Sequence, residues 1–293
     1  MAIVYAVLQI VAPVFLLAAI GYIWVLFGEE YRVAFVTRLA MTLSVPCLIF
    51  TSLMKTEIAP EALSVVVLAS VASYAVLTIL AWGIVKGLGL SSRTYWAPII
   101  FGNTGNLGLP LAVFAFGETG LGYAVVIFAV MAVYSFTIGI WMVSGKGAAS
   151  RILKEPMIWG TLLGALFLVK GWSTPVWLTN SLDLVGQMAI PLMLITLGVA
   201  VARLKLSQFG LPFLIAILKF STAVLVGWAM ARLFELPPIP FAVLVLQIST
   251  PVAVTSYLIA EKFGADAENV ASLVVFSTLL SVATIPLTLV FLI

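Results

Sequence analysis

Long apolar runs, each about as long as a membrane-crossing helix, alternate with short polar stretches along the whole chain. A helix needs about 20 mostly apolar residues to cross a bilayer. The pattern therefore predicts an all-α integral membrane protein with ten transmembrane helices. We expect them near residues 3–27, 33–53, 62–85, 94–116, 120–144, 157–170, 175–201, 210–232, 239–260 and 268–292. The sixth is short, so we expect it to lie at a thin spot or to extend through Trp172.

Two of these runs are interrupted where an unbroken helix should cross the membrane. The first break is Asn-Thr-Gly-Asn-Leu-Gly-Leu-Pro at 103–110, and the second runs from Gln247 to Pro251. Irregular backbone at this depth survives only where it is buried in protein or lines a polar cavity. Breaks at corresponding places in two halves are typical of a transporter whose binding site lies between repeats.

The two halves of the chain resemble each other. The sequence around Pro46 in the second run is similar to that around Pro191 in the seventh, and Pro110 and Pro251 follow at similar offsets. We therefore expect a first five-helix repeat at 1–144, a cytoplasmic linker at 145–156 and a second repeat at 157–293. Because five is odd, the second repeat would be inverted relative to the first, with broken helices 4 and 9 crossing.

The charges agree with a membrane protein and suggest its orientation. Only 9% of residues are charged, and a net charge of +3 is too small and dispersed for nucleic-acid binding. Basic residues gather on the cytoplasmic side of membrane proteins. The face away from the termini holds ten of them, against three on the face shared with the termini, so we expect both termini outside. The ten are Arg32, Arg38, Lys86, Arg93, Lys146, Arg151, Lys154, Arg203, Lys205 and Lys262, and the three are Lys55, Lys170 and Arg232.

Several residue types are scarce, which narrows the chemistry. The chain has no histidine, and Cys47 is its single cysteine. No metal site, cofactor or disulfide is therefore expected. An enzyme is disfavoured because no nucleophile has an evident base, and a sensor because no soluble output domain is evident. Proton coupling would have to use carboxylates, lysine or tyrosine.

The breaks themselves suggest an anion site. Ser249 or Thr250 before Pro251 is typical of a helix N-cap followed by proline, which predicts a half-helix beginning at Pro251. Glycines at 102, 105 and 108 permit unwound backbone in the other break. Each restarted helix presents free N–H groups and about half a positive charge at its N-terminus. Two such ends can bind an anion without any basic side chain.

Neutral hydrogen-bonding side chains fill both breaks. We expect Asn103 or Asn106 to contact the substrate, although both could instead satisfy the unwound backbone. For Gln247 and Thr250 the two roles are equally open, and Thr255 belongs to the same set. The candidate substrate-binding residues are Asn103, Thr104, Asn106, Gly108, Pro110, Gln247, Ser249, Thr250 and Pro251.

Two ionisable residues fall inside predicted spans. Asp183 lies about two turns into the seventh and Lys219 midway along the eighth. Such residues are costly in a membrane unless paired, so they are candidates for coupling to protons or substrate. The alternatives are that Lys219 extends along its stem toward the interface, or that Asp183 and Lys219 form a structural pair.

Several of these motifs resemble one known family. Asn103-Thr104 followed by Gly108-Leu109-Pro110-Leu111 is similar to the crossing of the auxin efflux carrier superfamily, which includes plant PIN exporters and bacterial carriers of malonate-like anions. Ile190-Pro191-Leu192, Pro251 and Ile285-Pro286-Leu287 resemble its seventh, ninth and tenth helices. The resemblance covers the whole chain, with the central loop as short as in bacterial forms.

The resemblance implies a fold like that of bile acid symporters, with helices 1, 2, 6 and 7 as scaffold and the others as a moving domain. It also implies a homodimer formed through the scaffold, elevator-like motion and a place in the bacterial inner membrane. We thus expect a secondary carrier of small organic carboxylate anions. The alternative is a sodium-coupled symporter, although this chain has Gln247, Ser249 and Thr250 where that clan has a carboxylate among its sodium ligands.

Overall fold

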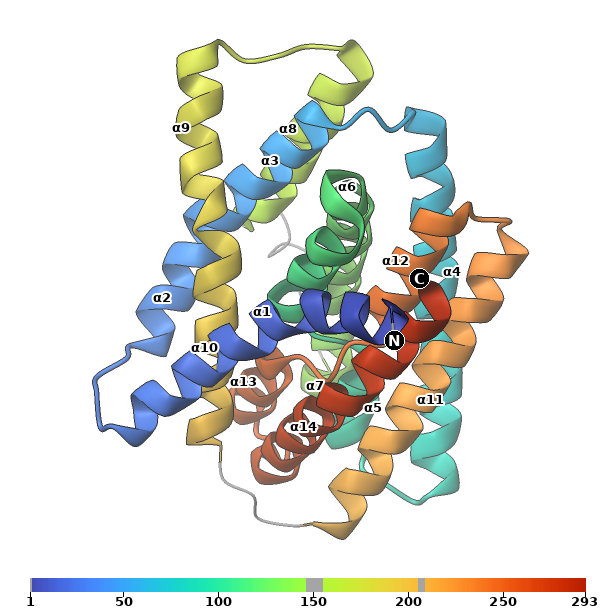
Figure 1. Ribbon diagram of the computed structural model, residues 1–293. Coiled ribbons are helices and arrows are strands. Elements are labelled where there is room, and N and C mark those ends of the chain that lie inside the picture. Colours follow the sequence, from blue (N-terminus) through green and yellow to red (C-terminus); the bar gives the residue numbers. More distant parts are fainter. Residues whose placement is uncertain (1, 146–154, 205–208) are drawn as a thin grey trace.

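Helices account for most of the chain in the computed structural model, which describes residues 2–145, 155–204 and 209–293 (Figure 1). Every apolar run predicted from the sequence contains helix, and the two runs with breaks, 94–116 and 239–260, are each interrupted by non-helical backbone. By length and composition, seven described helical stretches could each cross a membrane. They are Ile3–Leu26, Val33–Lys55, Pro60–Gly87, Thr104–Ser144, Val176–Arg203, Gly210–Leu233 and Ala267–Leu292. The number is below ten because one stretch covers parts of two predicted spans, while the sixth and ninth runs form shorter helices.

The first half of the chain contains two π-helical distortions close to prolines and a third near its end. Its elements are α1 (Ala2–Leu26), α2 (Val33–Leu39), η1 (Ala40–Ser44), α3 (Val45–Lys55), α4 (Pro60–Gly87), α5 (Ser92–Ile100), η2 (Thr104–Gly108), α6 (Leu109–Tyr134), η3 (Ser135–Gly139) and α7 (Ile140–Ser144). Gly117 interrupts α6 with φ 63° and ψ −156°. A positive φ is readily adopted by glycine, so the chain can turn here between the predicted fourth and fifth spans.

The second half contains α8 (Pro156–Lys170), α9 (Val176–Gln187), α10 (Ala189–Arg203), α11 (Gly210–Leu233), α12 (Pro238–Ile248), α13 (Val254–Phe263) and α14 (Ala267–Leu292). Helix α8 has 15 residues and ends at Lys170 because Gly171 adopts the left-handed conformation. The predicted sixth span is therefore short and does not extend through Trp172. Of the predicted linker at 145–156, residues 146–154 lie outside the described part of the chain.

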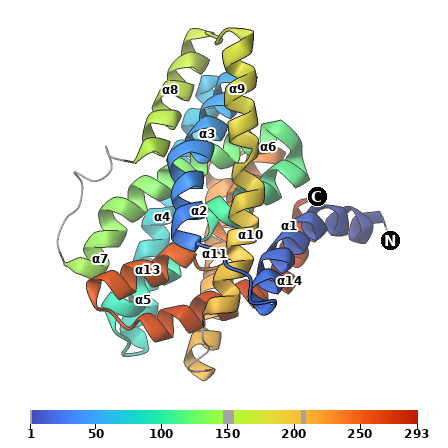
Figure 2. The same cartoon turned by 90° about the vertical axis from the view of Figure 1, so that its left-hand side faces the viewer.

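Close helix contacts depend on glycines that face a neighbouring backbone. Helix α3 packs against α8 and α9 in one group, and α1 packs along α10 and also contacts α14 (Figures 1 and 2). A Cβ atom at Gly21 or Gly198 would collide with the backbone of the opposite helix in the α1–α10 pair. Gly160 of α8 likewise lies against the backbone of Pro46. Small residues at such contacts are typical of helices that associate in lipid.

Candidate functional site

Two extended stretches of backbone pair at the centre of the fold. One joins α5 to η2 and the other joins α12 to α13, with Gly102 opposite Val252 in an antiparallel bridge. The N–H of Asn103 donates to the carbonyl oxygen of Pro251 at 2.7 Å, and the N–H of Ala253 donates to that of Phe101 at 3.2 Å. The two interruptions singled out in the sequence therefore meet and satisfy part of each other's backbone.

The approach of the two stretches requires glycine at two positions. A Cβ atom at Gly102 would collide with the hydroxyl oxygen of Thr250, and one at Gly108 would collide with the amide of Gln247. Both glycines have ordinary negative φ angles, so what they provide is space rather than an unusual conformation. The glycine-rich break is thus explained by close packing against the second break.

The half-helices begin at different residues from those predicted. Helix α13 begins at Val254, so the prediction that a half-helix begins at Pro251 is wrong. The hydroxyl of Thr250 donates back to the carbonyl oxygen of Gln247 at 2.7 Å, at the end of α12, and so does not cap the following helix. The reason is that residues 251–253 stay extended to pair with the other break. In the first break the helical backbone resumes at Thr104, and Pro110 lies within it.

A cavity of about 180 Å³ lies beside the crossing. Asn103, Asn106 and Thr255 contribute polar groups to its wall. The amide nitrogen of the Asn103 side chain, only 5% exposed, has no hydrogen-bond partner, and neither has the buried hydroxyl of Thr104 next to it. Much of the remaining wall is apolar and includes Met41, Phe101, Phe128, Met131, Met157 and Met193. The cavity wall therefore combines polar residues of the crossing, including Asn103, with a largely apolar surround.

Other predicted site residues lie away from this cavity. Ser249, Thr250 and Pro251 line a second cavity of about 10 Å³, together with Lys219. Gln247 is fully buried against Gly108, and both polar atoms of its amide lack a partner. The structure thus gathers the asparagines of the first break at the larger cavity, whereas the polar residues of the second break lie behind the crossing.

Lys219 of α11 contacts the crossing at the smaller cavity. Its side chain is 2% exposed, and its ammonium donates to the carbonyl oxygen of Thr250 at 2.9 Å. No carboxylate in the described chain forms an ion pair with it. Nearby, the N–H of Val252 donates to the hydroxyl of Ser277 at 3.0 Å. The amine of a buried lysine thus lies against the backbone that separates the two cavities.

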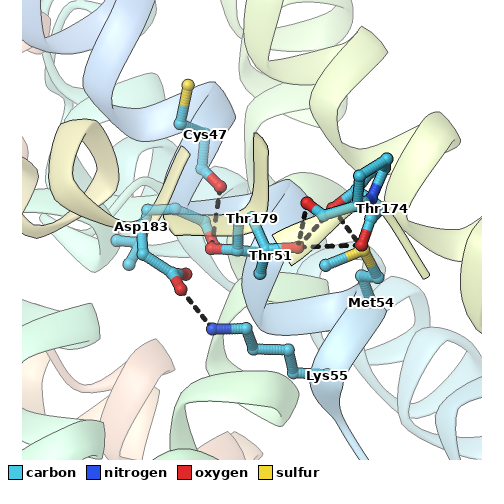
Figure 3. Close-up of polar contacts among 9 residues, drawn as sticks. Cys47, Thr51, Met54, Lys55, Thr174, Thr179 and Asp183 are labelled. Atoms are coloured by element: carbon cyan, nitrogen blue, oxygen red, sulfur yellow. Dashed lines mark hydrogen bonds and ion pairs between the residues drawn. The ribbon is translucent and has the colours of Figure 1, made fainter. Parts of the chain in front are cut away.

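Asp183 forms its contact in another part of the fold. Its carboxylate forms an ion pair with Lys55 of α3, against which α9 packs (Figure 3). The alternative that Asp183 and Lys219 form a structural pair is therefore wrong. In the same view, Thr51 donates to the carbonyl oxygen of Cys47 at 3.0 Å within α3, whereas Thr174, just before α9, donates to the sulfur of Met54 in α3 at 3.6 Å.

Some cavity residues had not been singled out in the sequence. Glu155, which directly precedes α8, is the one charged residue among the described residues that line the cavity. Burial raises the pKa of its carboxyl group. Thr196 also lines the cavity, and its hydroxyl lies 2.7 Å from that of Tyr31. The methionines and phenylalanines gave no local signal because they are apolar residues in apolar helices.

Interrupted helices that meet over a cavity are the arrangement of membrane transporters, and they occur here among several helices long enough to cross a bilayer. The protein is accordingly a multi-pass α-helical membrane transporter. A family model described as membrane transport protein matches residues 6–155 and 148–289, and the chain belongs to this family, the auxin efflux carriers.

Relatives of this chain carry transporter names. It is 27% identical to an uncharacterized transporter of Methanothermobacter thermautotrophicus, with 95% of this chain and 96% of the relative covered. It is 25% identical to an uncharacterized transporter of Methanocaldococcus jannaschii, with 96% and 97% covered. A putative malonate transporter of Rhizobium meliloti is 27% identical over 63% of this chain and 62% of its own length.

Proposed function

We propose that the protein is a secondary carrier of small organic carboxylate anions, which bind beside the crossing. The observation that carries this proposal is the unpaired, buried side-chain amide of Asn103 at the cavity wall. A buried donor without a partner costs free energy, of about 1–3 kcal/mol, which a bound acceptor would recover. The N-termini of the helical stretch from Thr104 and of α13 lie in the same crossing and favour negative charge.

The proposed architecture is two inverted five-helix repeats, 1–144 and 157–293, joined by a cytoplasmic linker. In support, each half has a span interrupted near its middle, by η1 before Pro46 and between α9 and α10 before Pro191. Each half also has one broken segment in the crossing. The distribution of basic residues supports outward termini in a bacterial inner membrane. The first, second, sixth and seventh predicted spans would form the scaffold and the dimer contact, and the other spans would move as an elevator.

Lys219 favours the plain anion carrier over the sodium-coupled alternative. When protonated, its amine places a positive charge behind the crossing, at the small cavity lined by Ser249 and Ser277. A sodium ion there would be repelled by this charge. The printed name of the Rhizobium relative, a putative malonate transporter, supports the choice of carboxylates as substrates.

Uptake into proteoliposomes tests the proposal. We expect saturable uptake of a radiolabelled carboxylate, with malonate and indole-3-acetate as probes, and no uptake of the neutral amide of the same acid. Uptake should be equal in sodium and in potassium media. Uptake that requires sodium would establish the symporter instead, and equal uptake of acid and amide would refute the carboxylate site.

A further inference from the structure

The cavity proposed to hold an anion has a carboxylate in its own wall. Glu155, which directly precedes α8, lines it together with residues of the crossing such as Asn103 and Asn106. No other described lining residue carries a charge. The formal charge contributed by the described wall is therefore negative whenever Glu155 is ionised, which opposes the entry of an anion.

The carboxylate of Glu155 has no compensating partner in the described chain. It does not cap α8, and its side chain forms no hydrogen bond or ion pair with residues 2–145, 155–204 or 209–293. Its chain neighbour Lys154 lies outside the described residues. The charged and titratable side chains on the elements that form the cavity wall or pack against α8 do not themselves line the cavity. They are Arg38, Cys47, Lys55, Glu118, Tyr123, Tyr134, Lys170, Arg203, Tyr257, Glu261 and Lys262.

The small size of the cavity brings a bound anion close enough to an ionised Glu155 for their negative charges to repel each other. A space of about 180 Å³ keeps any bound anion within roughly 10 Å of the wall, a distance over which partly buried charges are weakly screened. A nearby like charge favours the neutral form of a carboxyl group. An incoming anion therefore makes protonation of Glu155 more favourable.

We propose that binding of a carboxylate anion in this cavity is coupled to the uptake of one proton by Glu155. The inference rests on the proposed function, because it concerns the same cavity and the same anion. The proton comes from solution and forms an O–H bond on the Glu155 carboxylate, and no other bond changes. For a monoanion, the cavity carries one negative charge before binding, on Glu155, and one after binding, on the substrate.

Two properties of Glu155 favour this role. Burial alone already raises the pKa of its carboxyl group before an anion binds. A smaller further rise in this pKa is therefore enough for protonation on binding. A protonated Glu155 also adds a hydrogen-bond donor to the residues that line the cavity. Protonation thus removes a repulsive charge and adds an O–H group that can donate a hydrogen bond to a bound carboxylate.

The test is titration calorimetry of purified protein with indole-3-acetate, between about pH 6.5 and about pH 8.5, where this acid stays ionised. Linkage of one proton makes the wild-type affinity fall with rising pH, by up to about tenfold per pH unit. Calorimetry in two buffers of different ionisation enthalpy should count close to one proton taken up at the upper end of this range. The Glu155→Gln variant then shows whether Glu155 is the group that takes up this proton.

The Glu155→Gln variant should bind with an affinity that does not change over this range and that matches the wild type at its lowest pH. Glu118→Gln, which removes an exposed carboxylate at the turn after Gly117, should keep the wild-type slope. Wild-type binding without pH dependence or proton uptake, or a slope that persists in Glu155→Gln, would overturn the role of Glu155 and leave the anion site in place. Absence of binding at every pH, with malonate as well, would overturn both proposals.

Discussion

The ammonium of Lys219 donates a 2.9 Å hydrogen bond to the carbonyl oxygen of Thr250, in the backbone that crosses the other broken segment. This contact joins the middle of α11 to the residue before Pro251. It satisfies the carbonyl oxygen of Thr250, which has no helical N–H partner because the residues that follow it are extended. When protonated, Lys219 also places a positive charge behind the backbone that lines the proposed anion cavity.

Replacing Lys219 by methionine should separate a functional from a structural role. The variant loses one hydrogen bond but also loses a buried charge that no described carboxylate compensates, and removal of such a charge is often neutral or stabilising. We therefore expect an unfolding midpoint no lower than that of the wild type, with anion affinity weakened about tenfold or more because the attraction is lost. Thermal unfolding and anion titration of the same preparation measure both quantities.

Lys86→Met, at an exposed position near the end of α4, provides the matched control and should change neither quantity. A Lys219→Met protein that unfolds at lower temperature yet binds anions normally would show that the lysine is purely structural.

Gly102 and Gly83 form a matched pair for testing the crossing. A methyl group at Gly102 would collide with Thr250, whereas one at Gly83 meets nothing within 4 Å. Overpacking typically costs about 1–3 kcal/mol, so Gly102→Ala should lower stability and reduce binding. Gly83→Ala lies inside helix α4 and should raise stability by about 0.5–1 kcal/mol. Denaturation of both variants in detergent gives the comparison, and equal stabilities would contradict the close approach at Gly102.

Asp183→Asn should leave transport unchanged. The carboxylate pairs with Lys55, whose side chain is 50% exposed, and partly exposed ion pairs contribute at most about 1 kcal/mol. We expect wild-type uptake, the wild-type pH profile and a small change in unfolding temperature. Loss of uptake in a folded Asp183→Asn protein would contradict this expectation and make Asp183 a candidate for coupling again.

Much of the fold could be predicted because bilayer thickness and backbone hydrogen bonding act on local sequence. The apolar runs located the helices, and the interruptions at Asn103 and Pro251 located the crossing, since broken backbone in a membrane must be paired. The start of α13 was mispredicted because the N-cap pattern of Thr250 and Pro251 is local, whereas tertiary pairing with Phe101 and Asn103 keeps residues 251–253 extended.

The side chains around the cavity could be predicted only in part. Asn103 and Asn106 were found because polar residues stand out in an apolar helix. Glu155 was missed because a charged residue just before a helix is ordinary in sequence, and only the packing of α8 shows that it lines the cavity. The partner of Asp183 was also unpredictable, because it depends on which face of α9 packs against α3.

The most direct test of the anion site is the thermal shift produced by malonate and by indole-3-acetate in wild-type and Asn103→Ala protein. The side-chain amide nitrogen of Asn103 has no partner in the fold, so its removal should leave the unfolding midpoint without ligand nearly unchanged. Loss of a hydrogen bond to a charged group costs about 1.5–3 kcal/mol, which weakens binding roughly 10- to 100-fold. Asn180→Ala, at an exposed position on α9, is the control. We predict that at least one of these anions stabilises the wild type and Asn180→Ala but not Asn103→Ala at the same concentration. An equal shift in Asn103→Ala, or no shift in the wild type with either anion, would contradict a carboxylate site at the crossing.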